Sequence, residues 1–298
     1  MRAIVVGGSG FVGRHVVERL LRDGVDVVTI DRFQPPRPLS GETSIVCDIT
    51  ELESAESLAR GLETDALVWL PASIRQSANV DASVHDDVQL MVEAPLRFLR
   101  ALVSPPGSLV NLSSIQVYGR PRYLPVDEAH PTAPFTVYGV SKLCGEHYLS
   151  LAGSARGCSV ASLRAAFIYG PGQHEQNVIP RFLSELRQGR APVVHGDGNG
   201  VRDDVHVHDV AAAVSGAIER RAHGVFNVAS GRPHTLREVA EIACRVSGAG
   251  VTPSFETVEN DWVDRWYDVT RARAELGVGP PLDFETALRE MWITEVAA

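Results

Sequence analysis

The sequence has little cysteine and no long apolar run. Its four cysteines, Cys47, Cys144, Cys158 and Cys244, stand far apart and form no CxxC pair. Neither a zinc site nor a disulfide framework is therefore predicted, and a reducing cytoplasm is the expected compartment. The apolar run at residues 3–6 is too short for a signal peptide or a membrane span. We therefore expect a soluble, cytoplasmic protein.

The sequence also lacks a concentrated basic segment. The 298 residues carry a formal net charge of -9, with the basic residues scattered. A nucleic-acid surface needs a basic patch that displaces counterions, so no nucleic-acid partner is expected. Apolar residues make up 44% and charged residues 22%, as in ordinary globular proteins. The length suits one large α/β domain or two lobes that share a core.

Short apolar runs alternate with amphipathic segments over the first half of the chain. Residues 3–6 predict a buried strand, 14–23 a helix and 25–30 a second strand, which favours a parallel sheet. The same alternation predicts further strands at 43–47, 65–70, 108–113 and 158–163, and helices at 51–62, 84–103 (interrupted at Pro95) and 138–152. This order is typical of an α/β fold with a doubly wound parallel sheet.

The composition changes after Pro171, where proline and glycine become frequent and the expected strands become short. We therefore predict a dinucleotide-binding domain at 1–170 with a return segment near 203–230. Residues 171–298 are expected to form mainly a smaller, C-terminal substrate-binding lobe.

The turn after the first strand reads GGSGFVG from residue 7, a GxxGxxG pattern. Gly7 permits a tight turn, and Gly10 lets a pyrophosphate approach the N-terminus of the following helix. Gly13 allows this helix to pack closely on the sheet. Glycines at such a turn can also serve the turn alone, but the flanking strand and helix favour dinucleotide binding.

Asp31 ends the second expected strand, where a carboxylate can accept hydrogen bonds from both ribose hydroxyls and repel a 2′-phosphate. This favours NAD over NADP, although Arg32 and Arg37 soften the preference. Asp48 follows the third strand and stands either beside the adenine or as a helix N-cap. The remaining predicted cofactor contacts are Phe11, Val12, Ile49 and Leu70.

Tyr138 and Lys142 form a YxxxK pair, whose spacing places both side chains on one face of a helix. A nearby ammonium lowers the pKa of a phenol from about 10, so that the tyrosinate can act as a general base. Ser113 and Ser114 end a strand at the edge where such sheets bind ligands. A hydroxyl there can share the substrate oxygen with the tyrosine.

Taken together, these motifs resemble the extended short-chain dehydrogenase/reductase family, in its NAD-dependent epimerase/dehydratase branch, with a UDP-sugar 4-epimerase-like pattern. GGSGFVG, NLSSIQVYG, YGVSK, LRAAFIYGPG, NVIPRFL, GDGNGVRDDVHVHDVA, FNVASG and DVTRARAELG match family blocks in the family order. The resemblance implies a Rossmann-type fold and NAD as cofactor. It also implies that Tyr138 is the catalytic acid/base, Lys142 its partner and Ser114, rather than Ser113, the catalytic hydroxyl. Val117 and Tyr118 are expected to be packing residues.

The family oxidises a sugar carbinol with NAD, or runs the reverse reaction. In family members with 4,6-dehydratase activity, a Thr-Asp-Glu arrangement stands where this chain has Ser114-Ile115-Gln116. The decarboxylating members have glutamate in place of Gln116. Both reactions are therefore disfavoured. The leading prediction is a nucleotide-sugar epimerase acting at C4 through a transient keto-sugar. The alternatives are an NAD(P)-dependent reductase or dehydrogenase of a keto-sugar and, more remotely, a non-catalytic NAD sensor.

By the same resemblance, Arg202 grips the substrate diphosphate, and Asn177 and Val178 line the same pocket. Two residues depart from the family pattern, because Phe167 stands where an asparagine is usual and Asp204 where an aromatic residue is usual.

The arginine of an RxGD pattern is also replaced, near residues 258–261. These changes leave open a different head group, a substrate without a diphosphate, or substitution by Arg181 or Arg265.

His206 and His208 stand two residues apart on an expected strand and so share a face. The resemblance makes His206 structural, and no metal site is predicted. Trp262, Trp266 and Tyr267 are expected to pack the C-terminal lobe.

The helices at 84–103 and 138–152 resemble those that form the dimer interface in relatives. A homodimer is therefore expected.

Overall fold

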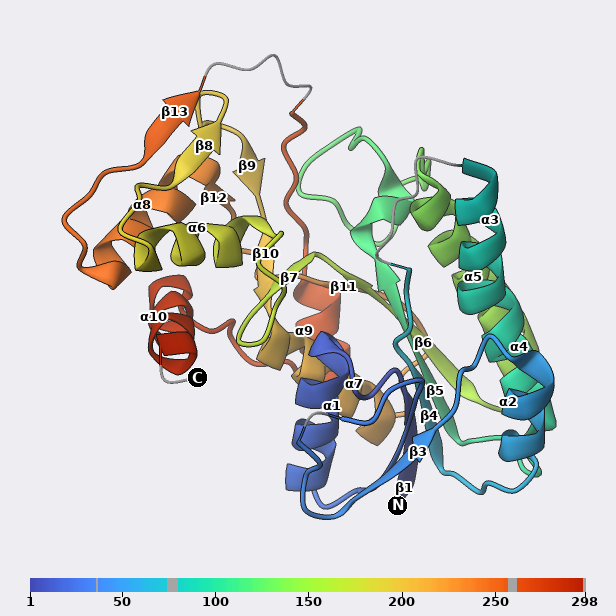
Figure 1. Cartoon of the computed structure of the whole chain (residues 1–298). Helices are drawn as coiled ribbons and strands as arrows, with labels where there is room; N and C mark the ends of the chain where they lie inside the picture. Colours follow the sequence, from blue (N-terminus) through green and yellow to red (C-terminus); the bar gives the residue numbers. More distant parts are fainter. Residues whose placement is uncertain (36, 74–79, 257–261, 297–298) are drawn as a thin grey trace.

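A computed structural model of the chain describes residues 1–35, 37–73, 80–256 and 262–296 (Figure 1). Seven parallel strands form the central sheet in the order β11-β6-β5-β4-β1-β2-β3. They are β1 (Arg2–Val6), β2 (Asp26–Asp31), β3 (Glu42–Val46), β4 (Ala66–Trp69), β5 (Ser108–Ser114), β6 (Ser159–Ala165) and β11 (Gly224–Val228). The predicted α/β fold with a doubly wound, Rossmann-type sheet is confirmed.

The centre of the sheet explains where a ligand can bind. Residues 3–6 of β1 are completely buried, as expected for a parallel strand that is covered on both faces. β1 pairs with β2 on one side and with β4 on the other. The strand order therefore reverses at β1, and ligands of such sheets bind beyond the carboxyl ends of the strands at this point.

Helices cover both faces of the sheet (Figure 1). One face carries α1 (Phe11–Arg22), α7 (Val207–Glu219) and α9 (Thr270–Leu276). The other side carries α2 (Leu52–Ala59), α3 (Val80–Val88), α4 (Ala94–Ala101) and α5 (Val137–Ser154). Two apolar cores result, one under α1 and α7 and one under α2, α4 and α5.

A smaller group of elements lies beside the carboxyl edge of the sheet (Figure 1). A third apolar core joins its helices, α6 (Val178–Arg187), α8 (Leu236–Ser247) and α10 (Phe284–Val296). Its strands form two-stranded pairs: β7 (Phe167–Tyr169) with β10 (Asp204–His206), β8 (Val193–His195) with β13 (Ser254–Glu256), and β9 (Val201–Arg202) with β12 (His234–Thr235). α7 and β11 return to the large sheet within the segment where a return was expected, while the domain boundaries themselves stay predictions.

Two local predictions differ from the structure. The helix expected at 84–103 is not broken at Pro95, which lies in the first turn of α4. Instead, a wide π-helical segment, Gln89–Glu93, joins α3 to α4 just before it, where the proline ring would crowd the preceding turn. The strand expected to carry both histidines ends at His206, which caps α7 through its ring, so that His208 lies in the helix.

Among the helices that the structure describes, none is both long and apolar enough to span a membrane.

Candidate active site

The glycine turn joins β1 to α1 with very little space. Gly7 has a φ of +82°, a conformation that side-chain-bearing residues rarely adopt. A Cβ on Gly13 would lie 2.1 Å from the carbonyl oxygen of Gly7. Because neither atom can be accommodated at that distance, glycine at position 13 is required for α1 to pack against the turn.

The N-terminus of α1 is prepared for an anion. Its N-cap is Gly10, no side chain caps it and no acidic residue lies in its first turn. The nearest atom to a Cβ built on Gly10 would be the Gly7 carbonyl oxygen, 3.5 Å away. The first-turn N–H groups of Phe11 and Val12 therefore have no side-chain acceptor, which suits the pyrophosphate of a dinucleotide.

Asp31 ends β2 beside this turn. Its carboxylate accepts hydrogen bonds from the backbone N–H groups of Ser9 (3.1 Å) and Phe33 (3.2 Å). These bonds fix the carboxylate next to the glycine turn, where a ribose is expected. The side chain of its neighbour Arg32 is exposed and stacks on the Phe33 ring.

Asp48 follows β3 and forms a local turn. Its Oδ1 accepts hydrogen bonds from the backbone N–H and the hydroxyl of Thr50, at 3.0 and 2.7 Å. The N-cap of α2 is Glu51, so the alternative that Asp48 caps this helix is wrong. Ile49 is buried beside it.

Lys142 connects the predicted catalytic residues to the glycine turn. Its ammonium donates hydrogen bonds to the carbonyl oxygens of Leu112 (2.7 Å) on β5 and Pro71 (3.4 Å) after β4. A Cβ on Gly7 would lie 3.2 Å from the Pro71 ring. The buried Leu70 precedes this proline. The lysine and the turn therefore lie at the same edge of the sheet.

Tyr138 lies one helical turn before Lys142, at the start of α5. Thr136 caps the helix, and its hydroxyl accepts a hydrogen bond from the N–H of Gly139. The Lys142 ammonium lies 5.8 Å from the centre of the Tyr138 ring. A hydrogen bond joins Tyr138 to the side chain of Ser114, the last residue of β5. The structure thus brings together the three residues that the sequence selected.

The pKa values of this pair differ from the sequence-based expectation. Burial raises the pKa of Tyr138 to about 12, although the hydrogen bond with Ser114 opposes the shift. Burial also lowers the pKa of Lys142 to about 8. The prediction that the lysine brings the tyrosine pKa below its usual value is therefore wrong here, because burial disfavours the phenolate more than the hydrogen bond with Ser114 favours it.

Ser113 points to a different partner. Its hydroxyl donates to the carboxylate of Glu146, which lies one turn after Lys142 and pairs with Arg164 at 2.7 Å. All three side chains are buried. This cluster holds α5 against β5 and β6. The sequence analysis missed Glu146, although its spacing of four from Lys142 places it on the same helix face.

Asp87 on α3 is a second acid that the sequence analysis missed. It is 4% exposed, and its charge interacts with those of Lys142 and Tyr138. A signal was present in the spacing of Asp87, Met91, Ala94 and Phe98. These positions form one buried helix face, on which an acid is unexpected.

Arg202, predicted to grip the substrate, is already paired. Its Nε donates to both carboxylate oxygens of Asp204, at 3.0 and 2.8 Å, and its Nη2 donates to one of them. The guanidinium also lies 4.4 Å from the centre of the Phe167 ring. The two departures from the family pattern, Phe167 and Asp204, therefore both contact the same arginine. Burial raises the pKa of Asp204, and Arg202 opposes that shift.

The other residues considered for the substrate lie in the smaller group of elements. Asn177 is the exposed N-cap of α6, which begins at Val178. Arg181 donates to the carbonyl oxygen of Val193. The backbone N–H of Arg265 donates to the carbonyl oxygen of Val201, so that its backbone lies next to Arg202. The remaining positions of the altered RxGD pattern, 258–261, lie outside the described residues.

Three histidines meet between α1 and α7. The rings of His206 and His208 are 4.6 Å apart, and the ring of His15 is 5.1 Å from that of His208. Burial lowers the pKa of His206 to about 3, which favours its uncharged form. Within the described residues, no group of three histidine, cysteine or acidic side chains has the geometry to hold a metal.

The predicted packing residues are mostly buried. Val117, Tyr118 and Tyr267 are at most 3% exposed, and the Tyr118 hydroxyl is 2.6 Å from Oδ1 of Asn227. Trp266 is partly buried. Trp262 lies against Gly200 and remains 38% exposed, so it packs at the surface of the lobe and not in its core.

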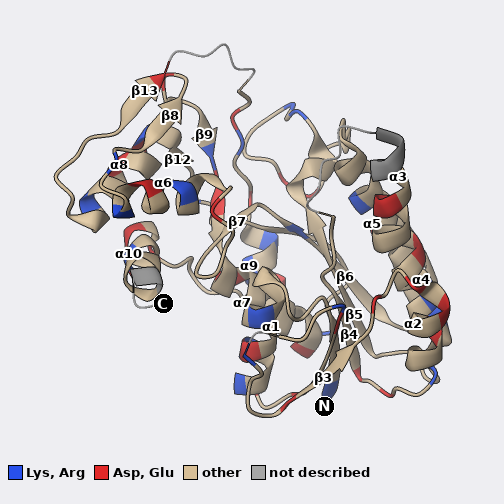
Figure 2. Ribbon diagram, in the orientation of Figure 1, with Lys and Arg blue, Asp and Glu red and all other residues tan. Residues whose placement is uncertain are grey.

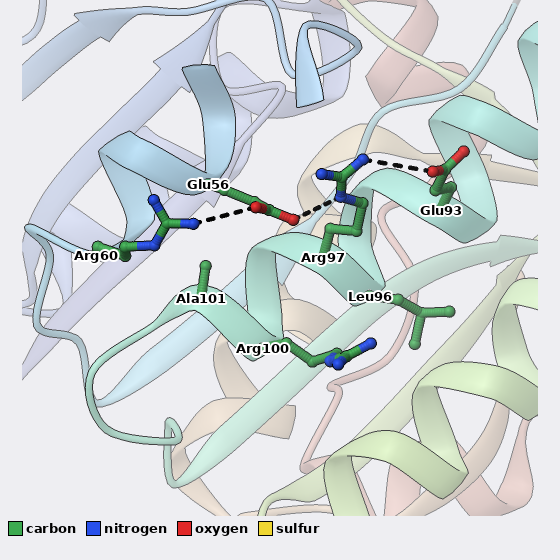
Figure 3. Close-up of a pocket in the computed structure, with 7 residues that line it drawn as sticks. All are labelled: Glu56, Arg60, Glu93, Leu96, Arg97, Arg100 and Ala101. Carbon is green, nitrogen blue, oxygen red and sulfur yellow. Dashed lines mark hydrogen bonds and ion pairs between the residues drawn. The ribbon is translucent and has the colours of Figure 1, made fainter. Parts of the chain in front are cut away.

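A pocket of about 620 Å³ lies elsewhere, between α2 and α4 (Figure 3). Glu56 accepts hydrogen bonds from both Arg97 and Arg60 along its wall. None of the predicted site residues lines it. Acidic and basic residues are interspersed along the ribbon in both parts of the molecule (Figure 2).

Comparisons with known proteins identify relatives of the chain. Residues 3–229 match the model of the NAD dependent epimerase/dehydratase family. The chain is 31% identical over 294 residues to the UDP-glucose 4-epimerase of Mycolicibacterium smegmatis, with 94% of each chain covered. It is 28% identical over 316 residues to a dTDP-glucose 4,6-dehydratase of Actinoplanes, covering 97% of this chain and 96% of the relative.

A solved structure is similar over the whole chain. The UDP-glucose 4-epimerase of Thermotoga maritima, determined with UDP-glucose, superposes with a TM-score of 0.85 at 25% identity. The match covers 99% of this chain and 100% of the other. The similarity therefore includes the smaller group of elements as well as the large sheet.

Proposed function

Since the chain belongs to the NAD dependent epimerase/dehydratase family, whose members are extended short-chain dehydrogenases/reductases, we propose that it is an NAD-dependent nucleotide-sugar epimerase acting at C4. The chain is an enzyme of this family, with nucleotide-sugar epimerases among its relatives. The observation that carries the proposal is the group of Ser114, Tyr138 and Lys142 beside the glycine turn.

The proposed cofactor is NAD, held at the carboxyl ends of β1 and β2. The unpaired N–H groups at the start of α1 suit the pyrophosphate. The Asp31 carboxylate suits the ribose hydroxyls and disfavours a 2′-phosphate. The proposed contacts are Gly7, Gly10, Phe11, Val12, Gly13, Asp31, Arg32, Asp48, Ile49, Leu70, Tyr138 and Lys142.

In the proposed mechanism, Tyr138 moves a proton, and the chemistry that NAD would supply when bound is the removal and return of a hydride. The Tyr138 oxygen takes the proton of the C4 hydroxyl as the sugar is oxidised to a keto-sugar. It gives the proton back after the keto-sugar has rotated in the site to present its opposite face. Ser114 holds the same substrate oxygen by a hydrogen bond. The Lys142 ammonium stabilises the tyrosinate.

The residues after β5 support epimerisation over elimination of water. A dehydration needs an acid and a base near the sugar, whereas this segment supplies Ile115 and Gln116. The side-chain oxygen of Gln116 accepts a hydrogen bond from Thr136. Gln116 is thus held by the N-cap of α5 and is neither acidic nor basic.

The alternative is a reductase or dehydrogenase of a keto-sugar that releases its cofactor. The ion pair of Arg202 with Asp204 favours this alternative to some extent, because it reduces the positive charge offered to a diphosphate. In that case the substrate is a keto-sugar, either free or linked to a nucleotide.

Incubation with UDP-, dTDP- and GDP-sugars, followed by NMR of the products and absorbance of NADH, separates the two functions. An epimerase interconverts two sugars with no net change in NADH. Stoichiometric formation of NADH from added NAD, or consumption of added NADH with a keto-sugar, would establish a dehydrogenase or reductase instead. Binding of NAD with no turnover of any sugar would favour a sensor.

We also propose that the protein forms a homodimer through α3 and α5. Val140, Tyr148 and Leu151 are exposed along one face of α5, and Val84 and Val88 are exposed on the adjoining α3. Such contiguous apolar side chains are typical of an interface. Light scattering of the protein eluting from a sizing column would report twice the chain mass, and a monomer at all concentrations would refute the proposal.

A further inference from the structure

The carboxylate of Asp87 is buried, and no arginine or lysine among the described residues forms an ion pair with it. The residue is 4% exposed, its Oδ1 has no hydrogen-bond partner, and a hydrogen bond with the Ser73 side chain satisfies the group in part. Burial of a carboxylate costs folding free energy unless the group is paired. Fully buried acidic side chains are therefore rare in proteins and are usually paired with a cation. A group that the structure keeps in this state requires an explanation.

α3 packs against α5 (Figure 1), and the groups that face Asp87 come from the active site. From α5, the ammonium of Lys142 and the hydroxyl of Tyr138 interact electrostatically with its carboxylate. On α3 itself, the exposed Asp86 adds a like charge. Of the described residues, Lys142 is therefore the cation that acts on Asp87.

The Lys142 ammonium interacts electrostatically with two acids, Asp87 and Glu146. Glu146 is neutralised by Arg164, which it contacts at 2.7 Å. Asp87 makes no ion pair with an arginine in the described part of the chain. Two of the three ammonium protons of Lys142 are directed at carbonyl oxygens, which carry no net charge. Among the described residues, Asp87 is therefore the acid near Lys142 whose charge no arginine compensates.

We propose that Asp87 is a positioning residue of the active site, which keeps the buried Lys142 in its charged form beside Tyr138. The inference rests on the proposed roles of Tyr138 and Lys142. It does not require Asp87 to touch the sugar or the cofactor.

The consequences for pH follow from the sign of each interaction. Burial lowers the pKa of Lys142 to about 8, and Asp87 opposes this shift. Burial raises the pKa of Tyr138, and Asp87 adds to this shift. Removal of the Asp87 charge therefore lowers both pKa values. The acid limb of the rate profile, set by the tyrosine as base, and the alkaline limb, set by the charged lysine, both move to lower pH.

The test uses the fact that Lys142 is the only lysine of the chain. In protein labelled with carbon-13 at the lysine Cε, one side-chain NMR signal reports the titration of Lys142 without any substrate. We expect the midpoint in Asp87→Asn to lie at lower pH than in the unaltered protein. The control Asp86→Asn removes the same charge from the exposed face of α3 and leaves the midpoint unchanged.

A second variant keeps the carboxylate in place. Ser73 stabilises the charged form of Asp87, so Ser73→Ala favours its protonation and shifts the Lys142 midpoint in the same direction, by less. If Asp87→Asn does not fold, this variant carries the test. A midpoint that is unchanged in the folded variants overturns the inference.

The activity profile separates this inference from the proposed function. With a sugar nucleotide that the enzyme converts, the pH of maximal kcat/KM falls in Asp87→Asn, and Asp87→Glu restores it in part. A uniform loss of kcat/KM with an unshifted profile contradicts the positioning role. If the NMR midpoint shifts but no sugar nucleotide is turned over by the unaltered protein, the proposed function fails and the role of Asp87 stands.

Discussion

The glycine turn after β1 and the β9–β10 segment both carry groups that suit phosphate, but the structure holds them in different states. At the turn, the first N–H groups of α1 have no side-chain acceptor. In the β9–β10 segment, the Arg202 guanidinium is paired with Asp204 and stacked on Phe167. The first region is therefore prepared for an anionic ligand, whereas in the second an anionic ligand must compete with a carboxylate of the protein. Family motifs therefore identify the cofactor side more securely than the substrate side.

The largest expected effect is the loss of kcat on substitution of Tyr138, which lies between the two regions. Tyr138→Phe removes the hydroxyl that transfers the proton while the glycine turn stays intact. We expect kcat to fall by about 10²–10⁴-fold, the usual contribution of a general acid or base. NAD affinity, measured by titration calorimetry, should remain within about twofold of its original value. Retained turnover would contradict the assigned role.

The next change tests the ion pair on the substrate side. Asp204→Asn leaves a largely buried arginine without its counter-ion, which we expect to lower the free energy of unfolding by about 3 kcal/mol. The freed guanidinium should then bind UDP more tightly, and UDP should restore much of the lost stability.

Thermal unfolding with and without UDP checks this prediction. Asp264→Asn is the matched control, since Asp264 accepts a hydrogen bond from the backbone N–H of Val201, the neighbour of Arg202. An unchanged or weaker UDP affinity in Asp204→Asn would mean that Arg202 does not face the substrate.

A smaller change tests how closely the cofactor side is packed. Gly13→Ala places a Cβ against the Gly7 carbonyl oxygen, and we expect a loss of about 1–3 kcal/mol in stability together with weaker NAD binding. Gly279→Ala is the control, because nothing lies within 4 Å of its Cβ. Equal melting temperatures for the two variants would show that the turn is looser than described.

The smallest effect concerns the choice between the two dinucleotides. Asp31→Asn keeps a side-chain acceptor for Ser9 but removes the charge. We expect NAD to bind more weakly by about 1.5 kcal/mol, and NADP to bind more tightly. Calorimetry with both cofactors measures the change, and an unaltered ratio of their Kd values would assign the selectivity to other residues.

Much of this fold and part of the site could be predicted from the sequence. The run at residues 3–6 and the glycines after it predicted β1 and the start of α1, because parallel strands and strand–helix turns leave strong local patterns. The spacing of Tyr138 and Lys142 likewise fixed their common helix face. These features depend on neighbours within a few residues.

The rest depended on tertiary contacts that spacing does not encode. The pKa of Tyr138 follows from its burial. Arg202 and Asp204 are only two residues apart in the sequence, but their ion pair depends on the rotamers of both side chains. Asp87 approaches Lys142 across two helices that are far apart in the sequence. The helical position of His208 depended on where β10 ends and α7 begins, a boundary that local patterns place only within a few residues.

The most direct test of the central claim follows a hydrogen atom. A UDP-sugar deuterated at C4 is incubated with the enzyme and NAD, and both epimers are examined by NMR and mass spectrometry. Epimerisation through a keto-sugar predicts that the product epimer keeps its deuterium at C4, because the same hydride leaves and returns. Replacement of the deuterium by solvent hydrogen, or accumulation of a keto-sugar with net formation of NADH, would contradict the account.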